Sequence, residues 1–197
     1  MPDTLNSGEK FLSEDERTFL LNLARQALHN AVNGEAVPLI QAESLTPNLR
    51  ETGASFVTLT RKGVLRGCIG ALEPYQGLAA DVREHAAAAA LEDYRFPPVQ
   101  PDELPEIQIE ISRLTVPQPL EYRDAHDLLQ KLRPGRDGVV LRDGYRRATF
   151  LPQVWEKIPR PEDFLDQLCM KMGAGSDLWR RKKITVLIYQ VEEFQES

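Results

Sequence analysis

The sequence predicts an α+β fold in which a mainly antiparallel sheet is flanked by helices. Strand-forming runs come in neighbouring pairs around two-residue turn signals, at 56–69 and 139–150, as in β-hairpins. Amphipathic helical segments separate these pairs, without the strict strand–helix alternation of a parallel sheet. The chain has 197 residues, 42% of them hydrophobic, which suits one large domain or a domain with a smaller lobe.

The N-terminal half predicts a helix, a loop and a hairpin. Ser13 and Glu16 have the spacing of a capping box, and apolar residues follow at helical intervals until Gly34. Residues 36–52 contain two prolines and predict a loop. Strands are expected at 56–60 and 64–69, joined by a turn at Lys62 and Gly63.

The next elements follow from the same periodicities. A helix is expected to start at Pro74, and its alanine-rich run at 86–90 would let it lie close against a sheet. Alternation at 107–111 predicts a half-buried strand, and residues 124–132 predict a short helix. Asp143 and Gly144 suit a type I′ turn in the 139–150 hairpin. A helix around 164–172 and a final strand at 184–191 complete the prediction.

Charge and cysteine content narrow the class of protein. The net charge is −6, but residues 141–183 carry ten basic and six acidic side chains, which predicts either a basic face for an anionic ligand or a solvated mixed surface. This excess is weaker than that of duplex-binding domains, so nucleic acid is not the expected partner. Two cysteines without a pairing pattern, a polar segment at 1–10 and no apolar run of ~18 residues predict a cytoplasmic protein without a membrane partner.

The segment Leu65–Gly70 (LRGCIG) is the candidate functional centre. Glycines at 67 and 70 weaken a strand, so each marks a bulge, a bend or a close approach to the backbone. Arg66 is expected on the same side of the strand as Cys68, where a cation would stabilise a thiolate. Cys68 and Arg66 are therefore candidate catalytic residues, with Gly67, Ile69 and Gly70 beside them. The same pattern fits a metal ligand, an anion site or a Cys68 that is simply a small core residue.

Two further segments hold candidate ligand-binding residues. Asp93, Arg95 and Phe96 lie in a charged loop after the alanine-rich helix, where Asp93 could pair with Arg66, bind a substrate amine or only fix the helix end. Thr149, Pro152 and Gln153 follow the second hairpin, either lining a cleft or forming an edge strand. His85 is a weaker partner for Cys68. Metal and nucleotide motifs are lacking, so no metal site is expected and the cofactor stays unknown.

Five segments of the chain, in this order, resemble the AMMECR domain family. They are LRGCIG (65–70), EDYRFPPV (92–99), ELPEIQIEISRLTVPQPL (103–120), DGVVLRDGYRRATFLPQVW (137–155) and FLDQLCMKMG (164–173). The resemblance implies a single AMMECR domain over 10–195, built of two unequal subdomains packed around a cleft, with boundaries that composition does not place. Its motifs fall on 65–70, on Asp93 to Pro97 and on Thr149 to Val154.

The resemblance also implies an association. Similar proteins occur as protein A of the AmmeMemoRadiSam system, beside a Memo-like protein and a radical SAM protein. Two hypotheses remain open at this point. The first is an enzyme or enzyme component with a cleft built on LRGCIG and a thiol-dependent Cys68, and the second is a non-catalytic adaptor that binds a small molecule, an anion or a protein.

Overall fold

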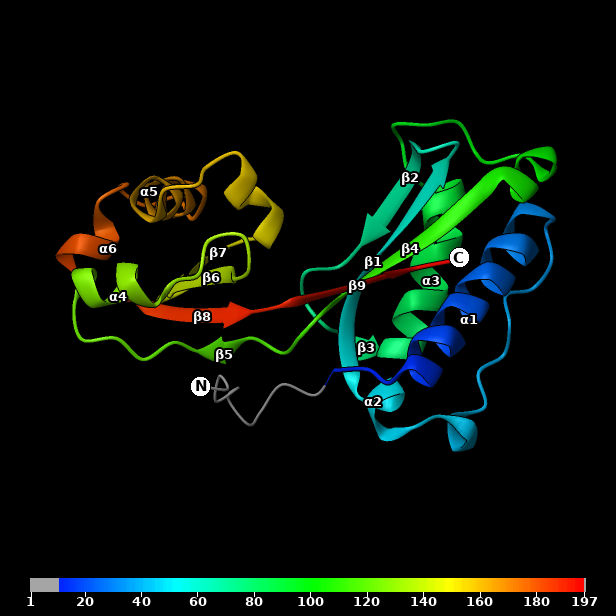
Figure 1. Ribbon diagram of the computed structural model, residues 1–197, viewed down its shortest axis with the longest axis horizontal. Coiled ribbons are helices and arrows are strands. Elements are labelled where there is room, and N and C mark those ends of the chain that lie inside the picture. Colours follow the sequence, from blue (N-terminus) through cyan, green and yellow to red (C-terminus); the bar gives the residue numbers. More distant parts are fainter. Residues whose placement is uncertain (1–10, 197) are drawn as a thin grey trace, which may run out of the picture. The chain divides into compact units, whose positions relative to one another are not determined.

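The computed structural model describes residues 11–196, which form two compact units (Figure 1). Within the described residues, unit 1 comprises 11–115 and 192–196, and unit 2 is Val116–Val191. Helices and antiparallel strands occur in both units, which confirms the predicted α+β class. The polar segment 1–10, including the expected domain start at residue 10, lies outside the described residues.

Unit 1 is a sheet with two long helices on one face (Figure 1). Its strand order is β2-β1-β4-β9, and β3 pairs with the start of β1. The elements are α1 (Glu14–Val32), η1 (Ala42–Ser44), α2 (Pro47–Arg50), β1 (Thr52–Arg61), β2 (Val64–Gly70), β3 (Gln76–Gly77), α3 (Leu78–Leu91), η2 (Pro101–Glu106), β4 (Ile107–Leu114) and β9 (Val191–Gln195).

The alternation of apolar and polar residues explains why only one face of this sheet carries helices. Val57 and Leu59 on β1 and Ile109 on β4 are fully buried in the core with α1 and α3. Their neighbours Thr58 and Glu110 point to the opposite face, because successive strand residues alternate sides. We call that opposite surface of the unit 1 sheet the helix-free face.

The local signals at the start of the chain are confirmed. Ser13 accepts from the Glu16 backbone and Glu16 accepts from the Ser13 backbone, so the capping box starts α1. The helix expected from Pro74 begins at Leu78, after the short strand β3. The loop expected at 36–52 contains two short helices, η1 and α2, the second capped by the Thr46 side chain.

The two hairpin turns differ from each other in a way that corrects one prediction. Lys62 and Gly63 both have positive φ, 52° and 76°, which is the type I′ pattern between β1 and β2. In the second hairpin Asp143 pairs with Arg146 inside the ladder, so the loop residues are Gly144 and Tyr145. Positive φ occurs there at Gly144 alone, as in a type II′ turn, so the type I′ prediction was wrong.

Unit 2 has its own sheet, of order β5-β8-β6-β7, and its own core. That core includes Trp155 stacked on Phe164, with ring centroids 3.7 Å apart. The elements are β5 (Gln118–Pro119), α4 (Ala125–Lys131), β6 (Gly138–Asp143), β7 (Arg146–Phe150), η3 (Pro152–Glu156), α5 (Pro161–Lys171), α6 (Leu178–Arg181) and β8 (Thr185–Tyr189).

The final strand expected at 184–191 is two strands in two sheets. β8 belongs to unit 2, whereas β9 starts at Val191 and pairs in the unit 1 sheet. Between them Gln190 is buried, and its amide donates to Asp137 at 2.7 Å. Residues 184–191 are apolar apart from Thr185 and Gln190, so they were expected to form one strand and composition does not reveal the change of sheet.

Candidate functional site

The LRGCIG segment is most of β2, the edge strand of the unit 1 sheet. Its register with β1 is irregular. Gly67 lies opposite Leu59 and Leu65 lies opposite Thr60, so Arg66 is the extra residue of a β-bulge. Simple alternation predicted that the Arg66 side chain lies beside Cys68. Because of the bulge, the Arg66 side chain does not follow this alternation.

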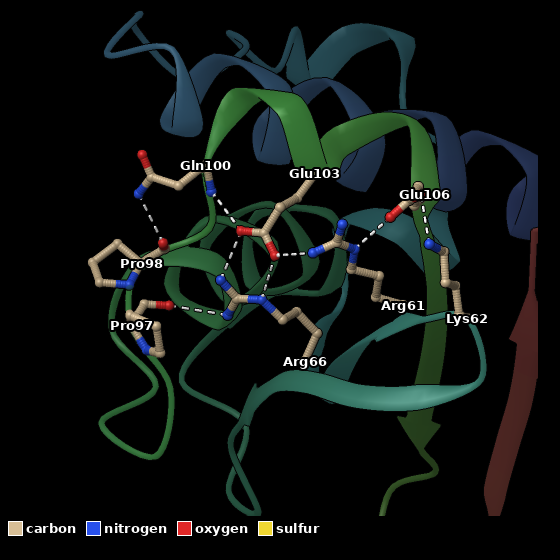
Figure 2. A network of polar contacts seen from close by, with 8 residues as sticks. All are labelled: Arg61, Lys62, Arg66, Pro97, Pro98, Gln100, Glu103 and Glu106. Atoms are coloured by element: carbon tan, nitrogen blue, oxygen red, sulfur yellow. Dashed lines mark hydrogen bonds and ion pairs between the residues drawn. The ribbon is translucent and has the colours of Figure 1, made fainter.

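Arg66 is held by a carboxylate on η2. Its Nε and Nη2 donate to the two oxygens of Glu103, each at 2.9 Å, and its Nη1 donates to the Pro97 carbonyl at 3.0 Å (Figure 2). Both side chains of the pair are largely buried, with 13% and 11% of their surfaces exposed. The hydrogen bonds from Arg66 lower the pKa of Glu103 to about 2. Arg66 therefore ties β2 to η2.

Glu103 is also the centre of a wider ion-pair network, shown in Figure 2. It accepts from Arg61 Nη1 at 3.1 Å and from the Gln100 backbone N–H at 2.8 Å. Arg61 and Lys62 both bind Glu106 as well. Networks of this kind with bidentate arginine geometry stabilise more than isolated surface pairs do.

Both glycines of the motif are required by close packing, one of the expectations for them. A Cβ at Gly67 would lie 2.1 Å from the Ala89 carbonyl oxygen on α3. A Cβ at Gly70 would lie 2.4 Å from the Phe56 ring. At Gly67 the strand packs directly against α3, and at Gly70 it packs against the Phe56 side chain. A larger residue at either position would require its neighbours to move.

Asp93 and Arg95 bind the backbone of Cys68. Asp93 Oδ2 accepts from the Cys68 N–H at 2.8 Å, and Arg95 Nη2 donates to the Cys68 carbonyl at 3.2 Å. The two side chains also pair with each other at 2.6 Å. The hydrogen bond from Arg95 is the main reason that the pKa of Asp93 lies well below its usual range. The pair takes the place of a neighbouring strand at the sheet edge, and Asp93 pairs with Arg95 and not with Arg66.

The side chain of Cys68 lies on the helix-free face. Its N–H and C=O point away from β1, so Cys68 and Thr58 form a non-hydrogen-bonded pair, in which side chains are closest. The Thr58 hydroxyl lies 3.3 Å from Cys68 Sγ as its hydrogen-bond donor. Arg95 is the cation that binds the Cys68 carbonyl, and its pKa is raised chiefly by its hydrogen bond with Asp93.

Glu110 continues the same row of residues across the sheet. It lies opposite Thr58 in the β1–β4 register, so Cys68, Thr58 and Glu110 follow one another on three adjacent strands. Burial, and secondarily Glu193, raises the pKa of Glu110. In the sequence, Glu110 is only one of the polar positions in the alternating run 107–111. Its proximity to the motif depends on strand pairing, for which the sequence held no direct signal.

His85 belongs to the other face of the sheet. Ser55 lies on the same side of β1 as the core residue Val57, and its hydroxyl donates to Asp81 at 2.6 Å. Asp81 Oδ2 in turn lies 3.2 Å from His85 Nδ1. The sheet thus separates His85 from the Cys68 side chain, and the structure does not bring these two residues together.

The remaining candidates divide between the units. Ile69 packs against the unit 1 core, and the Phe96 ring lies 5.5 Å from the Arg95 guanidinium carbon. Thr149, Pro152 and Gln153 lie in unit 2. There Thr149 contacts the Tyr189 hydroxyl at 3.2 Å, and Pro152 is buried at the start of η3.

Two classes of feature are lacking in the part of the chain that the structure describes. Among residues 11–196, no three His, Cys, Asp or Glu side chains gather in a way that could hold a metal ion. Within the same range, no helix has both the length and the apolar character needed to cross a membrane.

Fold and motif together define a class of two-unit α+β proteins with an LRGCIG edge strand. A sequence model of the AMMECR1 family matches residues 21–194, and the chain belongs to this family. The resemblance drawn from the five segments is thereby confirmed.

Relatives of similar length support the assignment. A protein from Thermofilum pendens is 37% identical, with 94% of this chain and 92% of that protein covered. One from Methanothermobacter thermautotrophicus is 38% identical, with 94% and 97% covered. The crystal structure of the uncharacterized protein PH0010 from Pyrococcus horikoshii superposes with a TM-score of 0.70 at 33% identity, covering 91% of this chain and 90% of that one.

Proposed function

We propose that the protein is a thiol-dependent enzyme or enzyme component whose reacting group is Cys68 on the helix-free face. One observation carries the proposal. Within LRGCIG, Arg66 is bound to Glu103, the glycines serve close packing and Ile69 packs on the core, whereas Cys68 is only half-buried and Leu65 is exposed. Of the two motif side chains that stay accessible, Leu65 and Cys68, only Cys68 carries a reactive group.

The surroundings of Cys68 suit a nucleophile. The Thr58 hydroxyl donates toward sulfur, and a hydrogen bond to a thiolate stabilises the charged form. Asp93 and Arg95 fix the Cys68 backbone on both sides of its Cα, so the thiol is held in place rather than on a free strand edge. In this proposal Arg66 holds strand β2 in place through its ion pair with Glu103, and it does not stabilise the Cys68 thiolate directly.

We further propose that this activity takes place in the cytosol and involves a Memo-like and a radical SAM protein. The support is the resemblance of the motif segments to AmmeMemoRadiSam protein A and the presence of two unpaired cysteines. Co-purification of the tagged chain with both proteins from one host would test the partnership. Failure to co-purify under crosslinking would contradict it.

A second candidate is a non-catalytic adaptor, favoured by a different observation. Unit 2 carries 14 basic and 10 acidic residues, against 10 basic and 20 acidic in the rest of the sequence. A unit with a net charge of +4 attracts anionic ligands or partner surfaces without any chemistry at Cys68. Thr149 and Gln153 of unit 2 would then belong to a binding surface.

The alkylation rate of Cys68 separates the two candidates. We expect the second-order rate constant with iodoacetamide at pH 7 to be higher in the native protein than in the urea-unfolded chain. Thr58→Val should lower the native rate, whereas Thr60→Val, one pleat further along the same face, should leave it unchanged. A native rate equal to or below the unfolded rate would contradict an activated thiol and favour the adaptor.

A further inference from the structure

Unit 1 contains a pocket of about 330 Å³ that belongs to neither the motif nor its ion-pair network. Its lining comes from α1 and from residues 38–44. Figure 1 shows the chain after α1 returning along this helix toward α2. This volume is at the lower end of the range for small-ligand sites. Its lining residues are Phe19, Asn22, Leu23, Gln26, Pro38, Leu39, Ile40, Gln41 and Ser44.

The α1 wall of the pocket is a single stripe of side chains. Phe19, Asn22, Leu23 and Gln26 are spaced by three, one and three residues, which places them on one helix face. Leu23 is buried, while Phe19 keeps 37% of its surface exposed. The stripe therefore presents an aromatic ring and two amides next to a buried aliphatic side chain.

The opposite wall is fixed in place by hydrogen bonds at both ends. Arg83 Nη1 donates to the Pro38 carbonyl at 3.1 Å, and Asn30 donates to the Ala36 carbonyl at 2.7 Å. After the pocket, the Thr46 hydroxyl donates to Glu16 on α1 at 2.5 Å. A wall held in this way is already formed before a ligand arrives, which lowers the ordering entropy that binding must overcome.

The chemistry of the lining is uncharged. None of its nine residues ionises, although 27% of the chain is charged. The amide groups of Asn22, Gln26 and Gln41 form no side-chain hydrogen bond within residues 11–196. Leu39 stands at the pocket with 94% of its surface exposed. An ion would find no counter-charge here, whereas a neutral ligand with amide groups and an apolar part finds partners for both.

We propose that this pocket binds an uncharged, extended peptide segment of a partner protein. A side-chain amide offers one acceptor and two donors, which matches the alternating C=O and N–H groups of a peptide backbone. One aliphatic side chain of the segment would lie among Phe19, Leu23 and Ile40. Cys68 does not line this pocket, so the peptide-binding proposal can be tested separately from the function proposed above.

The test is a titration of the ¹⁵N-labelled full chain, followed by NMR of the side-chain amides. The probe is acetyl-Ala-Leu-Ala-amide, and the matched charged peptide is acetyl-Ala-Glu-Ala-amide. We expect saturable shifts at Asn22, Gln26 and Gln41 with the leucine peptide only. Gln26→Ala should raise its Kd about three- to tenfold, the usual effect of losing one hydrogen bond. Gln167→Ala, an exposed glutamine of α5, should leave the Kd unchanged.

Three results would overturn the proposal. The first is the absence of saturable shifts at millimolar leucine peptide, and the second is an equal response to the glutamate peptide. The third is a shift of the same amides on raising the protein concentration without peptide, together with dimers in sedimentation. That result would make a second copy of the chain the occupant. The folding of each variant is checked by its backbone spectrum, so a collapsed variant cannot imitate any of these outcomes.

Discussion

Glu103→Gln is the change that most directly tests how the LRGCIG strand is held. Glutamine keeps the shape of the side chain and an oxygen for the Gln100 N–H, but it removes the charge that binds Arg66 and Arg61. The variant thus isolates the ionic part of the network. We expect unit 1 to lose stability at neutral pH while unit 2 keeps its own.

The magnitude follows from the pKa of Glu103. Its value in the folded protein, about 2, lies below its ordinary value of 4.5, so the folded state favours the carboxylate. That difference corresponds to about 3 kcal/mol, and solvent at the partly open edge of the network reduces it to about 2 kcal/mol. A lowered carboxyl pKa stabilises fully above the unfolded value and loses its effect as the pH falls through the folded value. The penalty of the variant should therefore be complete at pH 7 and vanish near pH 2.

The assay must report on unit 1 alone. Both tryptophans, Trp155 and Trp179, lie in unit 2, so their fluorescence follows the other unit. Amide hydrogen exchange of β1 and β4 measures the local opening free energy of the sheet that carries the motif. We expect this free energy to fall by about 2 kcal/mol in Glu103→Gln at pH 7, with a shrinking difference below pH 4.5.

A matched control uses the exposed end of α1. Glu14→Gln removes a carboxylate that is 87% exposed in its pair with Arg17, and should change the opening of β1 and β4 little. If Glu103→Gln lowered stability equally at pH 7 and pH 3, the effect would be steric. The lost charge would then not be the cause of the destabilisation. A loss confined to tryptophan fluorescence would likewise contradict the placement of this network in unit 1.

Three other outcomes are expected. Gly67→Ala places a Cβ 2.1 Å from the Ala89 carbonyl and should destabilise unit 1 by about 1–3 kcal/mol in exchange of β1 and β4. Unchanged amide exchange in β1 and β4 would mean that α3 moves to accommodate the added Cβ without a loss of stability. Asp93→Ala removes the acceptor of the Cys68 N–H, so amide exchange at Cys68 should rise about tenfold or more. Protection equal to that of the wild type would show that the Asp93 carboxylate is not needed to hold the Cys68 N–H. Cys169 has no exposed surface and a pKa raised by burial, so native mass spectrometry after iodoacetamide should show modification at Cys68 and not at Cys169. Modification of Cys169 but not of Cys68 would contradict the burial of Cys169 on α5.

Local chemistry made much of the fold predictable. The Ser13 and Glu16 side chains satisfy backbone groups within one turn, so their spacing alone indicated where α1 starts. Lys62-Gly63 supplied positive φ angles for the first hairpin, and alternation at 107–111 indicated which residues of β4 face the core. Each signal involves groups within a few residues of one another, so no knowledge of the rest of the fold was needed.

Contacts between distant segments were not predictable in the same way. Arg66 was expected to assist Cys68, but its carboxylate partner lies 37 residues away on η2, and a bulge redirects its side chain. The strand expected at 184–191 is divided between the sheets of unit 2 and unit 1, and a single polar residue, Gln190, is the sole sign of the division in the sequence. Several chain pairings satisfy the same alternation, so alternation alone does not select between them.

By itself, the sequence determined the α+β class, the family motif and the importance of the glycines around Cys68. Only the tertiary structure decided that Arg66 binds Glu103, that Asp93 and Arg95 hold the Cys68 backbone, and that Thr58 and Glu110 share its face. The physical reason is that propensity and turn chemistry act over a few residues. The partner of an ionic or backbone group depends instead on which segments the whole packed chain brings within hydrogen-bond distance.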